Sequence, residues 1–119
     1  MLTALKLYGI PNCNTVKKAR DWLECHAIAY EFHDFKKHGV SVQLLENWLT
    51  QVPHEKLINR AGLTWRGLED SVKAGIIDNA SAISLMQTKT SAIKRPILEK
   101  DGKILYLGFD ETQYQALLA

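Results

Sequence analysis

Residues 5–27 read LKLYGIPNCNTVKKARDWLECHA, and this stretch decides the fold. Its first residues, Leu5 to Tyr8, are typical of a short strand, and Gly9 to Pro11 then break regular structure. After Cys13, apolar residues recur at helical spacing on one face: Val16, Ala19, Leu23 and Ala27. The stretch therefore predicts a strand that leads through a tight break into a helix, with Cys13 at the helix start.

The position of Cys13 favours a reactive thiol. A helix start carries unpaired amide groups and the positive end of the helix dipole, and both stabilise an anion. Because the thiolate is the nucleophilic form of cysteine, this location predicts a thiol with a lowered pKa. The alternative is that Cys13 is a small buried apolar residue, a common role of free cysteine. Its position outside the apolar face of the helix speaks against that alternative.

Polar residues around this cysteine are candidates for binding an anionic thiol. Asn12, Asn14 and Thr15 are expected to cap the helix and to leave amide groups facing the sulfur. Three cations follow within two turns: Lys17, Lys18 and Arg20. The simplest interpretation of these cations is a solvated helix face, but they would also attract an acidic thiol such as glutathione.

Composition and charge exclude several classes of protein. The chain has 119 residues, of which 46% are hydrophobic and 24% charged, as in an ordinary globular domain. Its formal net charge of +2 is too small to indicate direct binding of nucleic acid. No apolar run reaches transmembrane length, and the N-terminus does not resemble a signal peptide. The two cysteines are then expected to be free thiols in the reducing cytoplasm, and the modest charge favours a monomer.

Later segments complete a sheet. Residues 29–35 predict a second strand, parallel to the first, in a β-α-β unit. Near the C-terminus, Asp101-Gly102 between two apolar runs is the strongest short signal for a hairpin. Asp110, with Gln113 three residues later, resembles a capping box for a last helix. The order β-α-β, helices, β-β-α predicts an α/β fold of thioredoxin type with a mixed sheet.

A helical insertion lies between these two parts. Ser41 is a plausible N-cap of a helix that Pro53 stops, and residues 54–88 look like short helical pieces. The residues expected to divide or cap these pieces are Gly62, Thr64, Gly67, Gly75 and Asp78. Apolar contacts are expected from the following residues: Leu57, Ile58, Leu63, Trp65, Leu68, Val72, Ile76, Ile77, Ile83, Leu85 and Met86. We therefore expect a single domain over residues 1–119, with the insertion at about 41–88.

Three motifs make the chain resemble a known family. They are Tyr8-Gly9-Ile10-Pro11-Asn12-Cys13, Lys18-Ala19-Arg20, and Arg95-Pro96-Ile97 before a hairpin that ends in Gly108-Phe109. Over essentially the full chain, they resemble the arsenate reductase-like family, which includes ArsC, Spx and YffB-type members. The resemblance implies a thioredoxin fold with a helical insertion and a single active cysteine, Cys13. It also implies a cis bond between Arg95 and Pro96, an Arg95 that faces the thiol, and Arg66 as a second anion-binding arginine.

The chain departs from the arsenate reductases near the cysteine. A histidine four residues before it, which helps to activate it, is here Gly9, and a serine three residues after it is Val16. Those enzymes also carry a third arginine after the last hairpin, where this chain reads LGFDE at residues 107–111. Spx-type regulators carry a Cys-x-x-Cys motif, and Val16 stands in place of the second cysteine. The chain is therefore most similar to the YffB-type members, which the resemblance links to glutathione-dependent thiol reduction.

Cys25 is not expected to act with Cys13. Twelve residues along a helix span ~18 Å, whereas a disulfide needs Cα atoms within ~7 Å. An external thiol, for which glutathione is the obvious supply, must then resolve a disulfide at Cys13. No spacing of cysteine and histidine indicates a metal site, and no bound cofactor is expected.

The two arginines have plainer alternatives. Arg95 would also fit a surface turn, and Arg66 would fit a solvated helix charge. A guanidinium close to a thiolate, however, lowers the thiol pKa and can hold a carboxylate or an oxyanion. Arg95 is the stronger candidate because it directly precedes Pro96 and a predicted strand.

The sequence thus predicts a monothiol reductase, with Cys13 and Arg95 as catalytic residues. Its thiolate attacks an oxidised sulfur species, and glutathione resolves the mixed disulfide. The residues predicted to bind glutathione or substrate are Asn12, Asn14, Thr15, Lys17, Arg66 and Pro96. One alternative is arsenate reduction, which the missing third arginine speaks against. The other is an Spx-like regulatory module that binds RNA polymerase, which residues 95–97 and 108–111 fit equally well.

Overall fold

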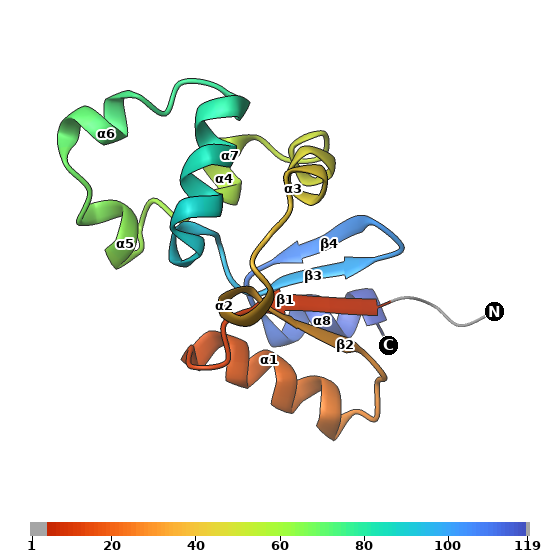
Figure 1. The fold of residues 1–119 in the computed structure, drawn as a ribbon. Coiled ribbons are helices and arrows are strands. Elements are labelled where there is room, and N and C mark those ends of the chain that lie inside the picture. Colours follow the sequence, from red (N-terminus) through yellow and green to blue (C-terminus); the bar gives the residue numbers. More distant parts are fainter. Residues whose placement is uncertain (1–4, 119) are drawn as a thin grey trace. The chain divides into compact units, whose positions relative to one another are not determined.

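The computed structural model describes residues 5–118 (Figure 1). The chain divides into two compact units. The sheet unit holds the residues up to His38 and those from Arg95 onward, and the helical unit is Gly39–Lys94. The helical unit is thus longer at both ends than the insertion expected at about 41–88. The single-domain organisation stays a prediction.

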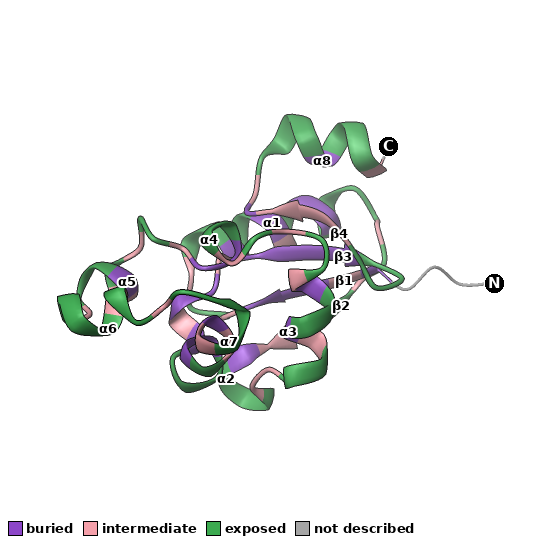
Figure 2. Cartoon of the chain, turned by 90° about the horizontal axis from the view of Figure 1, so that it is seen from above, coloured by how far each residue is buried: buried purple, intermediate pink, exposed green. Residues whose placement is uncertain are grey.

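The described part of the sheet unit forms a four-stranded sheet in the order β2-β1-β3-β4. Strand β1 (Leu5–Gly9) pairs in parallel with β2 (Glu31–Asp34) and antiparallel with β3 (Ile97–Lys100). Strand β4 (Lys103–Leu107) pairs antiparallel with β3. The central strands β1 and β3 are mostly buried, as the purple in Figure 2 shows. This mixed sheet confirms the predicted order of β-α-β before the insertion and β-β-α after it.

Helices α1 (Asn14–Cys25) and α8 (Glu111–Leu118) pack on the same face of the sheet. Side chains alternate along a strand, so Leu5 and Leu7 of β1 both point to this face. The buried residues of this core cluster are Leu5, Leu7, Ala19, Trp22, Leu23, Leu98 and Tyr114. The predicted inner face of α1 is confirmed except at Ala27, which lies after the helix, is exposed and has a left-handed φ of 54°.

Truncation of Leu23 to alanine is expected to lower the free energy of unfolding by about 2–5 kcal/mol. Leu23 is fully buried on α1, so the change leaves a cavity between the helix and the sheet. Urea denaturation would measure the loss. Lys18→Ala, on the exposed side of the same helix, is the control and should change stability by no more than about 0.5 kcal/mol. An equal effect of the two substitutions would contradict the packing described here.

The second strand is shorter than expected, and a helix that was not predicted follows it. Strand β2 ends at Asp34, and the short helix α2 covers Phe35–His38. The Asp34 carboxylate accepts hydrogen bonds from the N–H groups of Lys36 at 2.8 Å and Lys37 at 3.3 Å. This local side-chain to backbone bonding competes with continued strand pairing and starts the helical turn. The prediction of a strand over residues 29–35 was therefore wrong at its ends.

The C-terminal hairpin and helix begin as the sequence predicted. Asp101 and Gly102 have φ values of 51° and 84°, the left-handed conformations that a tight two-residue hairpin needs. The Asp110 carboxylate accepts the N–H of Gln113 at 2.9 Å, which confirms the predicted cap of α8. The buried Tyr114 hydroxyl donates to the carbonyl of Gly108 at 3.1 Å. These bonds fix the chain between β4 and α8.

The described elements of the helical unit are short. They are α3 (Val42–Leu49), α4 (His54–Leu57), α5 (Leu63–Arg66), α6 (Asp70–Ala74), α7 (Asn79–Thr88) and the 3-10 turn η1 (Thr90–Ala92). Ser41 caps α3, and Asp78 forms a capping box with Ser81 at the start of α7, so both predicted caps are confirmed. The predicted cap Thr64 is wrong, because it lies inside α5 and the N-cap of that helix is Gly62.

The helical unit extends to Lys94 because its last segment pairs with an earlier one. Ile58 and Ile93 form an antiparallel bridge, and the N–H of Lys94 donates to the carbonyl of Leu57 at 2.8 Å. The sequence offered no alternating pattern for this single bridge. Contacts between segments far apart in the chain therefore set the end of the unit.

The expected apolar residues of this unit are only partly buried. Those with low exposure are Leu57, Ile58, Trp65, Leu85 and Met86. Leu63, Val72 and Ile77 are 82%, 42% and 77% exposed, so the expectation that they pack in a core was wrong. Leu63 is the first residue of the four-residue α5, and a helix of one turn has too few residues to turn every apolar side chain inward. Among residues 5–118, no helix is long and apolar enough to cross a membrane.

Candidate active site

Cys13 lies at the junction between β1 and α1. It is the N-cap of the helix, with extended backbone angles of φ −136° and ψ 124°, and its carbonyl accepts the N–H of Lys17 at 2.9 Å. The side chain is half-buried. Cys25 is the last residue of the same helix and is exposed, and both cysteines are free thiols. The structure thus places one thiol at each end of α1.

The surroundings of Cys13 stabilise its charged form. Partial burial is the largest single influence and raises the pKa of the Cys13 thiol. The N–H of Val16, the hydrogen bond and charge of Arg95 and the N–H of Thr15 together outweigh burial, so the pKa lies below its ordinary value. Within residues 5–118, the Cys13 side chain accepts no hydrogen bond that caps α1. The two amides therefore act on the sulfur mainly as dipoles, which stabilise a thiolate more than a thiol.

Arg95 comes to the thiol from the neighbouring strand. It directly precedes β3 and is joined to Pro96 by a cis peptide bond, as the family resemblance implies. Its side chain hydrogen-bonds to Cys13. Pro96 is buried, and its carbonyl accepts the N–H of Gly108 at 2.7 Å. Because β3 pairs with β1, the strand that leads to Cys13, the sheet brings these two residues together.

The predicted cap and amide cradle need correction. The N-cap of α1 is Cys13 itself, so Asn12, Asn14 and Thr15 do not cap the helix as expected. The amides that act on the sulfur are those of Thr15 and Val16, whereas the sequence predicted the cradle at Asn12, Asn14 and Thr15. An N-cap side chain faces the amides two and three residues later, so the position of Cys13 could have indicated Val16. The predicted binding residues on this stretch are all exposed: Asn12, Asn14, Thr15 and Lys17.

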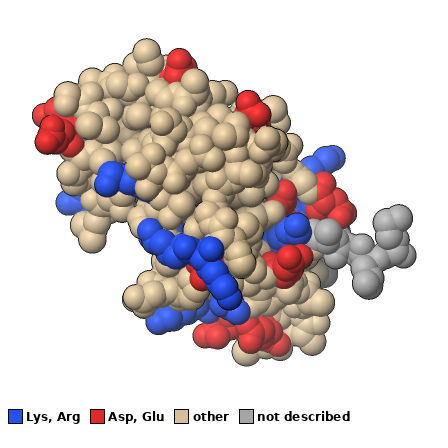
Figure 3. Space-filling view, in the orientation of Figure 1, with Lys and Arg blue, Asp and Glu red and all other residues tan. Residues whose placement is uncertain are grey.

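The cations of α1 do not all face solvent. Lys17 and Lys18 are exposed, but Arg20 donates to the Tyr30 hydroxyl at 3.0 Å. Its guanidinium also lies 4.1 Å from the centre of the Phe32 ring. Arg20 is therefore held against β2 and the turn before it. Figure 3 shows blue and red side chains interspersed on the face that it draws, in agreement with the small net charge.

Arg66 belongs to the helical unit. It is the exposed last residue of α5, and its carbonyl accepts a hydrogen bond from the Lys73 ammonium group at 3.3 Å. Its part in anion binding stays a prediction. Over residues 5–118, no group of three or more histidine, cysteine, aspartate or glutamate residues is arranged to hold a metal ion.

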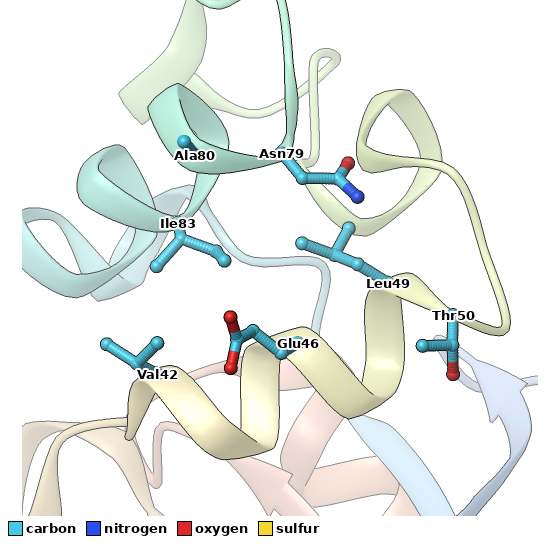
Figure 4. Close-up of a pocket in the computed structure, with 7 residues that line it drawn as sticks. All are labelled: Val42, Glu46, Leu49, Thr50, Asn79, Ala80 and Ile83. Atoms are coloured by element: carbon cyan, nitrogen blue, oxygen red, sulfur yellow. The ribbon is translucent and has the colours of Figure 1, made fainter.

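A separate hollow of about 480 Å³ lies between α3 and α7 (Figure 4). Its lining residues are Val42, Glu46, Leu49, Thr50, Asn79, Ala80 and Ile83. The close-up shows the Glu46 carboxylate beside the apolar side chains of Val42 and Ile83. An apolar lining with one carboxylate disfavours anions, so this hollow does not have the chemistry of the thiol site.

The sheet, the helix that starts after Cys13 and the arginine beside the thiol define a class of protein. They are the features of a thioredoxin-like protein with one cysteine at the start of its first helix. The chain belongs to the ArsC family, whose model matches residues 8–117. The predicted family and the predicted thioredoxin-like fold are both confirmed.

Three similar proteins illustrate the range of the family. The solved structure of the YffB protein is 43% identical, with a TM-score of 0.89 and coverage of 98% of this chain and 100% of its own. A Brucella melitensis protein described as related to arsenate reductase (ArsC) is 50% identical, with a TM-score of 0.77. The match covers 95% of this chain and 92% of the Brucella chain. The global transcriptional regulator Spx 1 of Lactococcus lactis subsp. lactis is 28% identical, with coverage of 96% and 88%. The chain thus resembles a reductase-related protein and a regulator over nearly its whole length.

Proposed function

We propose that this protein is a glutathione-dependent thiol-disulfide reductase in which Cys13 is the nucleophile. The observation that carries the proposal is the Cys13 thiol at the start of α1, with its pKa lowered by two amides and by Arg95. Attack on a disulfide requires a thiolate, and a lowered pKa increases the thiolate fraction near neutral pH. Membership of a family with arsenate reductase-related members supports an oxidoreductase.

The reaction has two exchange steps. In the first, the Cys13 thiolate attacks the glutathione sulfur of a mixed disulfide; a new disulfide forms between Cys13 and glutathione, and the substrate leaves as a thiolate. In the second, the thiolate of another glutathione attacks the glutathione sulfur of that disulfide. This step forms oxidised glutathione and returns the Cys13 thiolate. In the net reaction, the mixed disulfide and one added glutathione become the free substrate thiol and oxidised glutathione, so one disulfide is exchanged for another and Cys13 is regenerated.

Glutathione is the proposed second thiol because Cys25 is at the far end of α1. The twelve residues of the helix rise ~18 Å, far more than the ~7 Å that a disulfide between two Cα positions allows. Arg95 and the amides at the helix start favour the negatively charged thiolate. For the same electrostatic reason, they would hold a carboxylate of glutathione. The other proposed binding residues are Asn12, Asn14, Thr15, Lys17, Arg66 and Pro96. We further propose that the protein acts as a cytoplasmic monomer without a bound cofactor.

The test is turnover of a glutathionylated peptide by the purified protein with glutathione, together with intact-protein mass spectrometry. In a Cys25→Ser background, we expect turnover when free glutathione is present. When free glutathione is withheld, we expect a single glutathione adduct on Cys13. A protein with neither turnover nor adduct would overturn the proposal.

An Spx-like regulatory role is the second candidate, and the similarity to Spx 1 over nearly the whole chain favours it. Under this candidate, the protein binds RNA polymerase and needs no turnover. Co-purification with RNA polymerase that survives Cys13→Ser would support it. Failure of both the parent protein and the Cys13→Ser variant to retain polymerase would exclude it.

A further inference from the structure

Gly9 and Val16 touch where the strand ends and the helix begins. Gly9 is the last residue of β1, and Val16 lies in the first turn of α1. A Cβ atom placed on Gly9 would lie 2.8 Å from Cγ2 of Val16 and 3.4 Å from Cγ1. Val16 is fully buried and β-branched, so its methyl groups cannot easily turn away. Glycine at this position thus reflects a close approach and not an unusual backbone conformation.

The same valine supplies an amide to the thiol. Val16 is the third residue after the N-cap Cys13, and an N-cap side chain faces the amide of that position. Its N–H is one of the groups that favour the Cys13 thiolate. The side chain and the amide of one residue therefore connect the end of β1 to the sulfur.

We propose that Val16 is a positioning residue for Cys13: its side chain, packed on the bare backbone of Gly9, holds the first turn of α1 so that the Val16 N–H faces the sulfur. The inference rests on the proposed function only in taking Cys13 as the reacting group. It also connects the two positions near the thiol at which the chain departs from the arsenate reductase pattern. A side chain at position 9 and a valine at position 16 would compete for the same space.

The first two test variants break the contact from either side. Val16→Ala keeps the amide but removes both methyl groups that meet Gly9, and Gly9→Ala adds the Cβ that would push Val16 away. Each is expected to raise the pKa of the Cys13 thiol by about half a unit to one unit, because the dipole of the Val16 amide then points less directly at the thiolate. Thiolate absorbance against pH would measure the pKa in a Cys25→Ser background, where Cys13 is the one remaining cysteine.

The double variant Gly9→Ala/Val16→Ala gives the sharper result. With the Cγ atoms gone, the nearest atom of residue 16 to the new Cβ is its own Cβ, at 3.7 Å, an ordinary van der Waals contact. The contact between strand and helix is then restored by different atoms. We expect the thiol pKa of the double variant to lie closer to that of the parent than either single variant. If the two substitutions instead acted on the thiol independently of their mutual contact, their pKa changes would add.

Two further variants separate positioning from general loss of packing. Val16→Thr keeps the branched shape and is expected to keep the thiol pKa, although a buried hydroxyl lowers stability. Leu23→Ala, on the same helix but away from the thiol, should lower stability without a change in the pKa. If Val16→Ala does not fold, Gly9→Ala and Val16→Thr still test the contact from its two sides.

The inference is overturned if Val16→Ala or Gly9→Ala leaves the thiol pKa unchanged, or if the double variant shows the sum of the two shifts. This measurement needs neither glutathione nor a substrate. A sub-additive shift together with absent turnover would therefore support Val16 as a positioning residue while it contradicted the proposed reductase. Turnover of the parent protein, with no change of the thiol pKa in the variants, would support the proposed reductase and contradict the role of Val16.

Discussion

Replacing Cys13 with serine is expected to abolish reduction of a glutathionylated peptide, with a loss on the order of 10³-fold or more. A serine hydroxyl has nearly the size of the thiol, so the fold should be retained, but it does not ionise near neutral pH and cannot form the mixed disulfide. The rate of glutathione oxidation would measure the loss.

Cys25→Ser is the matched control for this prediction. Cys25 is exposed at the far end of α1, so its replacement should leave turnover unchanged. Full activity of the Cys13→Ser variant would contradict the proposed mechanism. Loss of activity only in Cys25→Ser would assign the chemistry to the other end of the helix.

The Cys13→Ser variant should also differ from the parent protein in how its free energy of unfolding depends on pH. The folded-state pKa of Cys13 is lowered, whereas that of an unfolded cysteine is about 8.5. The thiolate therefore contributes stability that is fully present above the unfolded pKa and is lost as pH falls through the folded pKa. Cys13→Ser lacks this contribution, so its deficit in unfolding free energy should grow as pH rises through that window.

Removal of the Arg95 guanidinium is expected to have the second largest effect. Arg95 lowers the Cys13 pKa by a hydrogen bond and by its charge, so Arg95→Ala should raise that pKa by about one unit. Turnover near neutral pH should fall by up to about tenfold, because fewer molecules carry the thiolate. A profile of kcat/KM against pH would measure both changes.

The pH profile also separates two roles of Arg95. At a pH above the raised pKa, the loss caused by incomplete ionisation disappears. Any loss that remains there reports binding of an acidic substrate or glutathione by the guanidinium. Arg20→Ala is the control, since Arg20 contacts Tyr30 and Phe32 and should not move the profile. An unchanged profile in Arg95→Ala would exclude Arg95 from the thiol site.

Local sequence patterns were sufficient for much of the fold. The periodic apolar residues of α1, the caps Ser41, Asp78 and Asp110, and the Asp101-Gly102 turn all act through neighbours within a few residues. Such features depend on backbone geometry and short side-chain to backbone bonds. The start of the helix at Cys13 belongs to this group, so the candidate thiol could be found without any tertiary contact.

Other features depended on contacts that local patterns do not encode. Strand pairing alone brings Arg95 beside Cys13, and only the resemblance to the family had suggested it. The approach of Gly9 to Val16 joins the end of a strand to a helix and leaves no mark in the apolar pattern, so Val16 looked like an ordinary core residue. The exposure of Leu63 is likewise a property of its surroundings. The sequence by itself determined which elements form and where the thiol lies, because neighbouring residues decide both. Only the tertiary structure decided that Arg95 joins the local amides at the sulfur, because the packing of segments distant in the chain places that side chain.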